Sequence, residues 1–238
     1  WALEKGYRAI DTAAFYKNEK YVGKAIQESD VPRNEIFLTS KVWDTDLGYE
    51  NTLNAFDKSL TRLDVEYLDL YLIHWPRKLR NESWKALEEL YKQGKIKAIG
   101  VANFAISHLQ ELLEKFEIVP AVNQFELHPF LYSERKELID FCWDNEIQVE
   151  AYSPLTHGKQ LHNPQLKSIA TKYNKTTAQI LIRWSLQHGF VVIPKSGNKQ
   201  HIRENSEVFD FQISDGDMKQ INSIEKEFRL LYDTSTWA

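Results

Sequence analysis

The sequence has 238 residues, 42% of them hydrophobic, and a formal net charge of −4, so it can bury a sizeable core within one domain. The two signs of charge are interspersed and no basic run stands out, which argues against nucleic acid as a partner. The apolar runs fall short of the roughly 20 residues that a membrane helix needs, so no membrane association is expected. The single Cys142 cannot form an internal disulfide, which favours a reducing, cytoplasmic location.

Seven short apolar runs, rich in β-branched and aromatic residues, recur along the chain. Such runs are predicted to be buried strands, and their apolar character on both faces is typical of a parallel sheet covered by helices. They are YRAID at 7–11, EIFLTSK at 35–41, YLDLYLIHW at 67–75, KAIGVAN at 97–103, AVNQFEL at 121–127, QVEAYS at 148–153 and VVIPKS at 191–196.

The segments between these runs have the period of helices. Hydrophobic residues recur at steps of three and four between Leu53 and Leu63, and again from Trp84 to Tyr91. Gly94 suits the position just beyond a helix end. Two residue pairs have the spacing of a capping box and so predict helix starts, namely Ser107 with Gln110 and Thr176 with Gln179.

Strands that alternate with helices predict right-handed βαβ units and a parallel sheet. Two architectures fit, an open doubly wound sheet and a (β/α)8 barrel. The open sheet usually carries a GxGxxG motif, and none of the nine glycines forms that pattern or a P-loop. We therefore predict an α/β fold, a (β/α)8 TIM barrel, as a single domain over residues 1–238.

The number of predicted strands is seven, whereas a closed barrel of this type needs eight. The opening segment WALEKG has the look of the final turns of a helix that ends at Gly6. We therefore expect the first strand and most of the first helix to be missing from this chain. The gene product is expected to begin ~25–40 residues earlier, which is the span of a βα unit.

Polar or ionisable side chains follow or end every predicted strand. In a barrel, the C-terminal ends of the strands form the active site, although any one such residue is commonly an ordinary hydrogen-bonding group at a loop mouth. The residues are Asp11, Lys41, His74, Asn103, Gln124, Tyr152 with Ser153, and Lys195 with Ser196.

Four residues at the first three predicted strands suit the protonation of a carbonyl oxygen. Asp11 beside Lys41 would keep the lysine charged and in place. The ammonium would favour the phenolate of Tyr16 and lower its pKa from ~10 by ~1–3, so that Tyr16 could act as a general acid near neutral pH. His74 could donate a hydrogen bond that orients and polarises the carbonyl. These residues leave open what attacks the carbon.

Several motifs together resemble those of the aldo-keto reductase family. They are IDTAAFYKNE, LTSKVW, LYLIHWP, AIGVANF, VNQFELHP, YSPL and VVIPKSGNKQHIREN. The resemblance covers nearly the whole chain and is nearest to small bacterial members similar to 2,5-diketo-D-gluconate reductase. It implies a barrel that reduces aldehydes or ketones to alcohols with NADPH, or with NADH as an alternative. Asp11, Tyr16, Lys41 and His74 match the family's catalytic tetrad, with Tyr16 as proton donor and the hydride coming from the nicotinamide.

The same resemblance implies a cofactor site and a substrate pocket. The residues matched to the cofactor are Asn103 and Gln124 at the carboxamide, Tyr152 stacked on the nicotinamide, Ser153 and Leu155 at the pyrophosphate, and Lys195, Ser196, His201, Glu204 and Asn205 at the adenosine end. Phe15, Trp43 and Trp75 match the walls of the substrate pocket. The family commonly has Arg where this chain has His201, which weakens the preference for NADPH because Arg is the better phosphate clamp. Ala102 stands where the family often has Ser.

Two other functions compete with this interpretation. A class I aldolase would form a Schiff base on Lys41 or Lys195, but it leaves Tyr16 and His74 without roles. A catalytically impaired relative would bind nucleotide as a sensor or auxiliary subunit. No metal is expected, because His157 and His162 lack Cys or carboxylate neighbours. The expected partner is a small carbonyl substrate, and a monomer is expected when the missing N-terminal segment is present.

Overall fold

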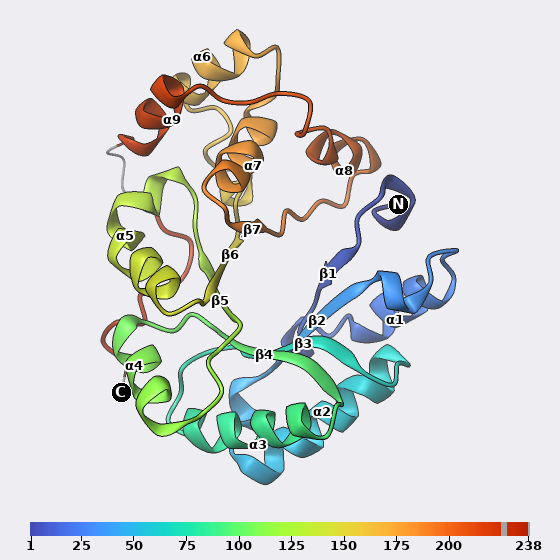
Figure 1. Cartoon of the computed structure of the whole chain (residues 1–238). Coiled ribbons are helices and arrows are strands. Elements are labelled where there is room, and N and C mark those ends of the chain that lie inside the picture. Colours follow the sequence, from blue (N-terminus) through green and yellow to red (C-terminus); the bar gives the residue numbers. More distant parts are fainter. Residues whose placement is uncertain (225–227, 238) are drawn as a thin grey trace. The chain divides into compact units, whose positions relative to one another are not determined.

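The computed structural model describes residues 1–224 and 228–237, in which strands and helices alternate (Figure 1). The hydrogen-bonded order of the strands follows the chain from β1 to β7. All seven predicted strands are confirmed, as β1 (Ala9–Asp11), β2 (Phe37–Val42), β3 (Leu68–Ile73), β4 (Ile96–Ala102), β5 (Val122–Glu126), β6 (Gln148–Tyr152) and β7 (Val191–Val192). None of the helices in the described part of the chain has the length and apolar character needed to traverse a bilayer.

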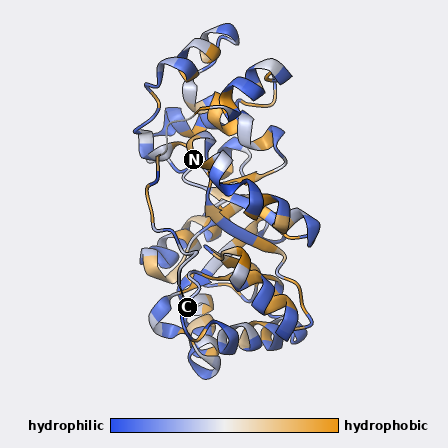
Figure 2. Cartoon of the chain, turned by 90° about the vertical axis from the view of Figure 1, so that its left-hand side faces the viewer, coloured by the Kyte–Doolittle hydropathy of each residue, from blue (hydrophilic) through white to orange (hydrophobic). Residues whose placement is uncertain are grey.

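Nine α-helices and five short 3₁₀ helices connect these strands within the described residues. The α-helices are α1 (Glu19–Gln27), α2 (Tyr49–Leu63), α3 (Arg80–Lys92), α4 (Ile106–Lys115), α5 (Pro129–Asp144), α6 (Pro164–Lys172), α7 (Thr177–Gln187), α8 (Lys199–Ser206) and α9 (Asp215–Asn222). The 3₁₀ helices are η1 (Leu3–Lys5), η2 (Ala14–Tyr16), η3 (Arg33–Glu35), η4 (Asp44–Asp46) and η5 (Thr156–Gly158). Figure 2 shows hydrophobic and hydrophilic residues mixed along the helices, as expected for helices with one face buried.

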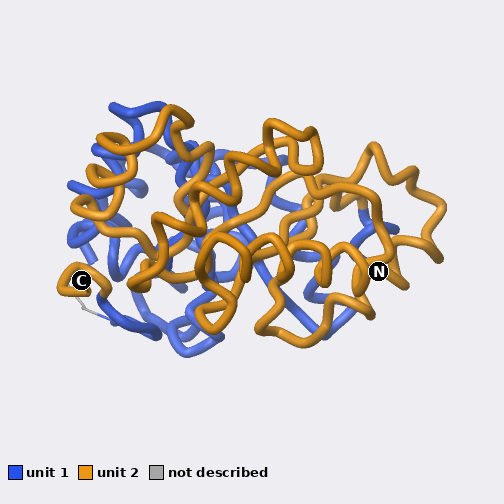
Figure 3. The backbone as a smooth tube through the Cα atoms, turned by 90° about the horizontal axis from the view of Figure 1, so that it is seen from below, with its two compact units in different colours: residues 1–5, 124–233 blue, residues 6–123, 234–238 orange. Residues whose placement is uncertain are grey.

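The chain forms two compact units, coloured separately in Figure 3. Unit 1 contains residues 1–5 and 124–233, and unit 2 contains residues 6–123 and 234–238. The point of division falls inside β5, between Asn123 and Gln124. The single-domain organisation stays a prediction.

Unit 2 is built on the parallel strands β1 to β4. Asp11 pairs with Thr39 and Lys41 pairs with Leu72, which sets the register of the site-bearing strand ends. Every residue of β3 is buried, as expected for a strand of a parallel sheet with both faces covered. Helices α2 and α3 pack against each other, and α2 packs on β2 while α3 packs on β3 and β4 (Figure 1).

A glycine allows β4 to approach the start of β5 within unit 2. A Cβ atom on Gly100 would lie 2.7 Å from the Val122 carbonyl oxygen and 2.8 Å from Leu72 Cδ2. No side chain fits at these distances, so the close packing of the two strands requires glycine at this position.

Unit 1 contains the second half of β5, followed by β6 and β7. Ala151 of β6 pairs with Val192 of β7 in parallel. Helix α5 packs on β6, α7 packs on β7, and α9 packs on α5 and α6. The core of this unit includes Trp184, which is fully buried on α7, and Phe125 of β5.

The predicted helix boundaries are confirmed at three places and wrong at one. Gly94 follows the end of α3 with φ 74°, and Thr176 and Gln179 form the predicted capping box of α7. Gly6 follows η1 with φ 89°. The Ser107–Gln110 cap is wrong, because α4 already begins at Ile106 and the amide of Ala105 donates to His108 Nδ1 instead.

Candidate active site

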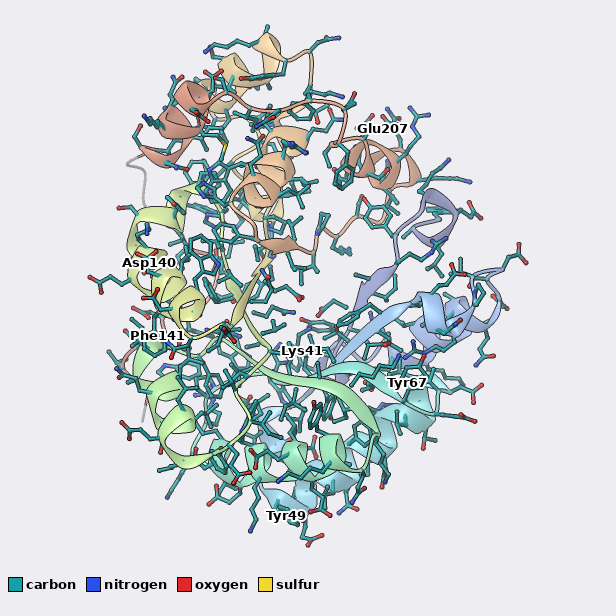
Figure 4. All side chains as sticks on the ribbon, in the orientation of Figure 1. Lys41, Tyr49, Tyr67, Asp140, Phe141 and Glu207 are labelled. Carbon is teal, nitrogen blue, oxygen red and sulfur yellow. The ribbon has the colours of Figure 1, made fainter. Side chains whose placement is uncertain are left out.

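The Lys41 ammonium lies at the centre of a charged cluster in unit 2. Lys41 is fully buried, and its Nζ donates to both carboxylate oxygens of Asp11, at 2.6 and 2.7 Å, and to the Thr12 carbonyl at 3.0 Å. Figure 4 labels Lys41, which belongs to β2. The two residues end or nearly end adjacent strands, so the parallel register alone brings them together. The ion pair favours the charged form of the lysine and fixes its position.

Tyr16 lies over this ammonium, with Lys41 Nζ 5.1 Å from the centre of its ring. The residue is 45% exposed, yet burial raises the pKa of Tyr16 above its ordinary value. The charge of Lys41 and a hydrogen bond to it lower the pKa, the charge of Asp11 raises it, and the net direction is upward. The predicted lowering is therefore wrong, because burial outweighs the ammonium. Tyr16 is a protonated phenol at neutral pH, the form that can donate a proton.

The imidazole of His74, directly after β3, is neutral. Burial, together with the charge of Lys41, lowers the pKa of His74 to about 3. Its ring meets the Tyr16 ring edge-on, with 5.7 Å between centroids and an interplanar angle of 88°. The buried Nδ1 atom has no hydrogen-bond partner. A neutral imidazole carries one N–H, so His74 can donate a hydrogen bond without adding a positive charge beside Lys41.

Aromatic side chains surround these polar groups in unit 2. Phe15 stacks on Trp43 with ring centroids 3.8 Å apart, and Trp43 meets the edge of His74 at 5.2 Å. Trp75 stacks against His74 at 6.3 Å. The three residues predicted to form pocket walls, Phe15, Trp43 and Trp75, therefore gather at the same polar cluster.

One aromatic residue of this cluster was missed from the sequence. The ring centroids of Trp237 and Trp75 are 5.4 Å apart, and Arg77 Cζ lies 3.8 Å from the centre of the Trp237 ring. The Trp237 carbonyl is 2.8 Å from His108 Nε2, which fixes the segment on α4. The only signal was a tryptophan near the C-terminus, in a tail whose position the sequence does not predict.

Asn103 follows β4 in a left-handed conformation, with φ 64°. Its side-chain amide donates to the carbonyl of His74 at 3.0 Å, and its own carbonyl accepts the Thr234 hydroxyl at 2.7 Å. Asn103 thereby links the ends of β3 and β4, so it is held beside His74 as the strand-end pattern predicted.

The residues matched to the remaining part of the cofactor lie in unit 1. The Gln124 amide donates to Glu150 at 2.7 Å, and the Tyr152 carbonyl accepts the Leu127 amide. Ser153 has φ 52°, and its hydroxyl lies 3.1 Å from His157 Nε2. Leu155 directly precedes η5. Tyr152, Ser153 and Leu155 lie at or just beyond the C-terminal end of β6, and Gln124 of β5 contacts β6 through Glu150.

A second group in unit 1 surrounds the start of α8. Lys195 is exposed, and Asn198 caps the helix by accepting from the amides of Gln200 and His201 at 2.8 and 3.2 Å. Ser196 accepts the Asn198 amide at 3.1 Å. Further along the helix, Asn205 is buried and the Glu204 carbonyl accepts the Gln179 amide. Two of the helix amides are thus already satisfied by Asn198, so an anion here would meet side chains and the helix dipole rather than those amides.

No grouping of three or more His, Cys, Asp or Glu side chains suited to a metal ion occurs within residues 1–224 and 228–237. His157 contacts Ser153.

Comparison with known proteins identifies the family. The sequence model of the Aldo/keto reductase family matches residues 1–226. The chain is 56% identical over 230 residues to a glyoxal reductase of Bacillus subtilis (strain 168), covering 96% of this chain and 83% of that protein. The chain therefore belongs to the aldo/keto reductase family. As a member of this family, it is an NAD(P)H-dependent oxidoreductase.

Solved structures support the same fold. The aldo-keto reductase MGS-M4 from a Medee basin deep-sea metagenome library matches with a TM-score of 0.96 and 46% identity, over 100% of this chain and 88% of that one. An aldo-keto reductase of Bombyx mori, solved in complex with NADP, matches with a TM-score of 0.91 and 34% identity, over 100% of this chain and 85% of that one. The predicted (β/α)8 fold class is confirmed by these matches.

Proposed function

We propose that this chain catalyses the NADPH-dependent reduction of aldehydes or ketones to alcohols, with Tyr16 as the proton donor, and that it works in the cytoplasm. The observation that supports this most directly is the placement of the Tyr16 phenol over the buried Lys41 ammonium, beside the neutral imidazole of His74. A phenol, an ammonium and an imidazole N–H together suit an oxygen that gains negative charge and then a proton.

Each of the four polar residues has a distinct part in this proposal. His74 donates a hydrogen bond to the carbonyl oxygen and orients it. NADPH, when bound, supplies the hydride that the carbonyl carbon receives. Tyr16 gives its proton to the oxygen and becomes a phenolate, which the adjacent Lys41 ammonium stabilises. Asp11 holds Lys41 in place throughout, because both carboxylate oxygens accept from its Nζ.

We propose a nicotinamide dinucleotide phosphate as the cofactor. We propose that Asn103 and Gln124 hold the carboxamide, that Tyr152 stacks on the ring, and that Ser153 and Leu155 contact the pyrophosphate. At the adenosine end, the exposed Lys195 ammonium, Ser196 and His201 would meet a 2′-phosphate at the start of α8, with Glu204 and Asn205 beside them. Since His201 is a weaker clamp than Arg, the preference for NADPH over NADH is expected to be modest.

Small aldehydes are the substrate class to test first. The B. subtilis relative named glyoxal reductase supports glyoxal as a substrate, and the stacked Phe15 and Trp43 offer an apolar wall beside the polar groups. An aldolase is less well supported. Schiff-base formation on Lys41 needs a neutral amine, and Lys41 is buried in an ion pair, whereas Schiff-base formation on Lys195 leaves Tyr16 and His74 without roles.

The test is the oxidation of NADPH by the wild-type chain with glyoxal and with a small aromatic aldehyde. Tyr16→Phe should lower turnover by ~10²–10⁴-fold, the usual contribution of a general acid, and leave cofactor affinity nearly unchanged. Tyr21→Phe is the matched control, because Tyr21 is 74% exposed on α1. Near-wild-type turnover by Tyr16→Phe would contradict the assignment. Nucleotide binding without turnover in the wild type would favour the impaired relative, and borohydride trapping of a lysine adduct would favour the aldolase.

A further inference from the structure

We infer that Thr12 and Asn18 are positioning residues for Tyr16, because the hydrogen bond between their side chains closes the loop that carries the phenol. We call residues 12–18 the tyrosine loop. The inference rests on the proposed role of Tyr16 as proton donor.

The tyrosine loop adopts a conformation that its own sequence does not favour. Tyr16 ends the short helix η2, where its amide donates to the Ala13 carbonyl at 3.0 Å. Lys17 then turns the chain in the left-handed region, with φ 54°. The left-handed backbone conformation favours glycine and asparagine and is unfavourable for lysine. Contacts beyond the local backbone must therefore hold the loop in shape.

The Thr12–Asn18 bond provides such a contact. The Thr12 hydroxyl donates to Asn18 Oδ1 at 2.6 Å, across six positions of the chain. Asn18 stands at the N-cap position of α1, where an asparagine side chain ordinarily accepts from the first amides of the helix. Here it makes no such bond to the helix. Its side-chain oxygen instead accepts from the residue that begins the loop.

Both ends of the tyrosine loop are also fixed to β2, and the far end is fixed to α2 as well. At the start, the Thr12 amide donates to the Thr39 carbonyl at 2.9 Å, and the Thr12 carbonyl accepts Lys41 Nζ. At the far end, the buried Glu19 carboxylate accepts from Ser40 Oγ and Arg62 Nε, both at 2.6 Å. The side-chain bond therefore spans two fixed points, and Tyr16 lies between them.

Helix α1 adds a further restraint on the far end. A Cβ atom on Gly23 would lie 2.1 Å from the Leu63 carbonyl oxygen, so α1 lies directly against the end of α2. With both ends held, loss of the Thr12–Asn18 bond would free the middle of the loop rather than unfold the unit. The phenol would then lie over Lys41 for a smaller fraction of the time, which lowers the rate of proton donation.

The test compares variants that remove or keep the bond. Thr12→Val and Asn18→Ala should each lower kcat roughly tenfold, since each removes the partly buried Thr12–Asn18 hydrogen bond, while KM changes by less than about twofold. Thr12→Ser keeps the hydroxyl and should restore kcat. The double variant should lose little more than either single variant, because both act through one bond. Thr61→Val is the control, since the Thr61 hydroxyl donates to the Asp57 carbonyl on the exposed surface of α2.

A kinetic isotope effect separates positioning from simple loss of folded protein. With NADPH deuterated at the transferred position, Thr12→Val should show a larger isotope effect on kcat than the wild type, because the chemical step becomes more rate-limiting. A smaller folded fraction would lower kcat and leave the isotope effect unchanged, which would overturn the inference. Unchanged kcat in both single variants would do the same. If Thr12→Val fails to fold, the isotope effect on kcat is measured on Asn18→Ala instead, and the same two outcomes support or overturn the inference. Full activity of Tyr16→Phe would overturn the proposed function itself, and this inference with it.

Discussion

Removing both members of the Asp11–Lys41 ion pair together should restore most of the stability that removal of either one costs. Lys41 is fully buried and the Asp11 side chain is 12% exposed. Lys41→Met or Asp11→Asn deprives the remaining charge of its ion-pair partner, and breaking a buried pair in this way costs about 3–5 kcal/mol. The partial exposure of Asp11 places the cost of Lys41→Met at the lower end of this range.

The double variant carries neither charge. Replacement of a whole buried pair by uncharged side chains of similar volume is often close to neutral, so we expect its free energy of unfolding to lie within about 1–2 kcal/mol of wild type. The measurement is the guanidinium midpoint with an unchanged slope. Lys172→Met is the control, because Lys172 is 54% exposed in its pair with Asp217 and should cost at most about 1 kcal/mol.

Activity should not follow stability in these variants. Without the ammonium beside Tyr16, the double variant should stay reduced in turnover by ~10²-fold or more despite its recovered stability. Two results would refute the reasoning. Strict additivity of the two single costs would mean that the residues do not act as one electrostatic unit, and recovered turnover would mean that Lys41 is not needed for proton donation.

Four further predictions concern other parts of the chain. The pKa of His74 is lowered to about 3, so between pH 6.5 and 4.5 only the unfolded state takes up this proton. Lowering the pH from 6.5 to 4.5 should therefore reduce the free energy of unfolding by ~2–3 kcal/mol more in the wild type than in His74→Gln, as measured by denaturant midpoints. Gly100→Ala should cost about 1–3 kcal/mol because its Cβ meets the Val122 carbonyl. Gly216→Ala on α9, whose Cβ would meet Ser214 Oγ at an ordinary 4.0 Å, should be neutral or stabilising in the same assay. His201→Arg should increase the NADPH over NADH preference by ~1–2 kcal/mol in competing kcat/KM measurements, and equal use of both cofactors by the starting chain would argue against phosphate contact at Lys195. If residues 1–238 are one domain, near- and far-ultraviolet circular dichroism should report one coincident unfolding transition, and two separated transitions would mean two domains.

The sequence predicted the strands well because each is a short apolar run bounded by polar residues, and a parallel register then brings the strand ends together. The Asp11–Lys41 contact follows from that register alone. The pKa of Tyr16 was misjudged because a sequence identifies the neighbouring charge but gives no measure of burial. Trp237 was missed for a related reason: its place depends on where a tail of irregular structure docks, and no periodicity reports that.

The cap at α4 shows a further limit of sequence patterns. Ser107 and Gln110 have the right spacing, but the N-cap is Ala105, two residues earlier, whose amide donates to His108 Nδ1, and the helix begins at Ile106. A spacing rule identifies residues able to cap a helix, while the contacts of the surrounding chain decide which one does. The Asn18 side chain, which bonds to Thr12 rather than capping α1, is a second case of this kind.

The grouping of tryptophans has a spectroscopic consequence. Three of the seven tryptophans belong to the candidate site: Trp43 and Trp75 contact His74, and Trp237 contacts Trp75. Trp84 and Trp184 are fully buried in the cores of the two units. Trp1 and Trp143, which are 57% and 42% exposed, should dominate the response to added quenchers, whereas a molecule bound at the candidate site should change the emission of Trp43, Trp75 and Trp237. These three tryptophans are intrinsic fluorescent probes of the site, so its occupancy can be titrated by their emission, without a label and without any turnover.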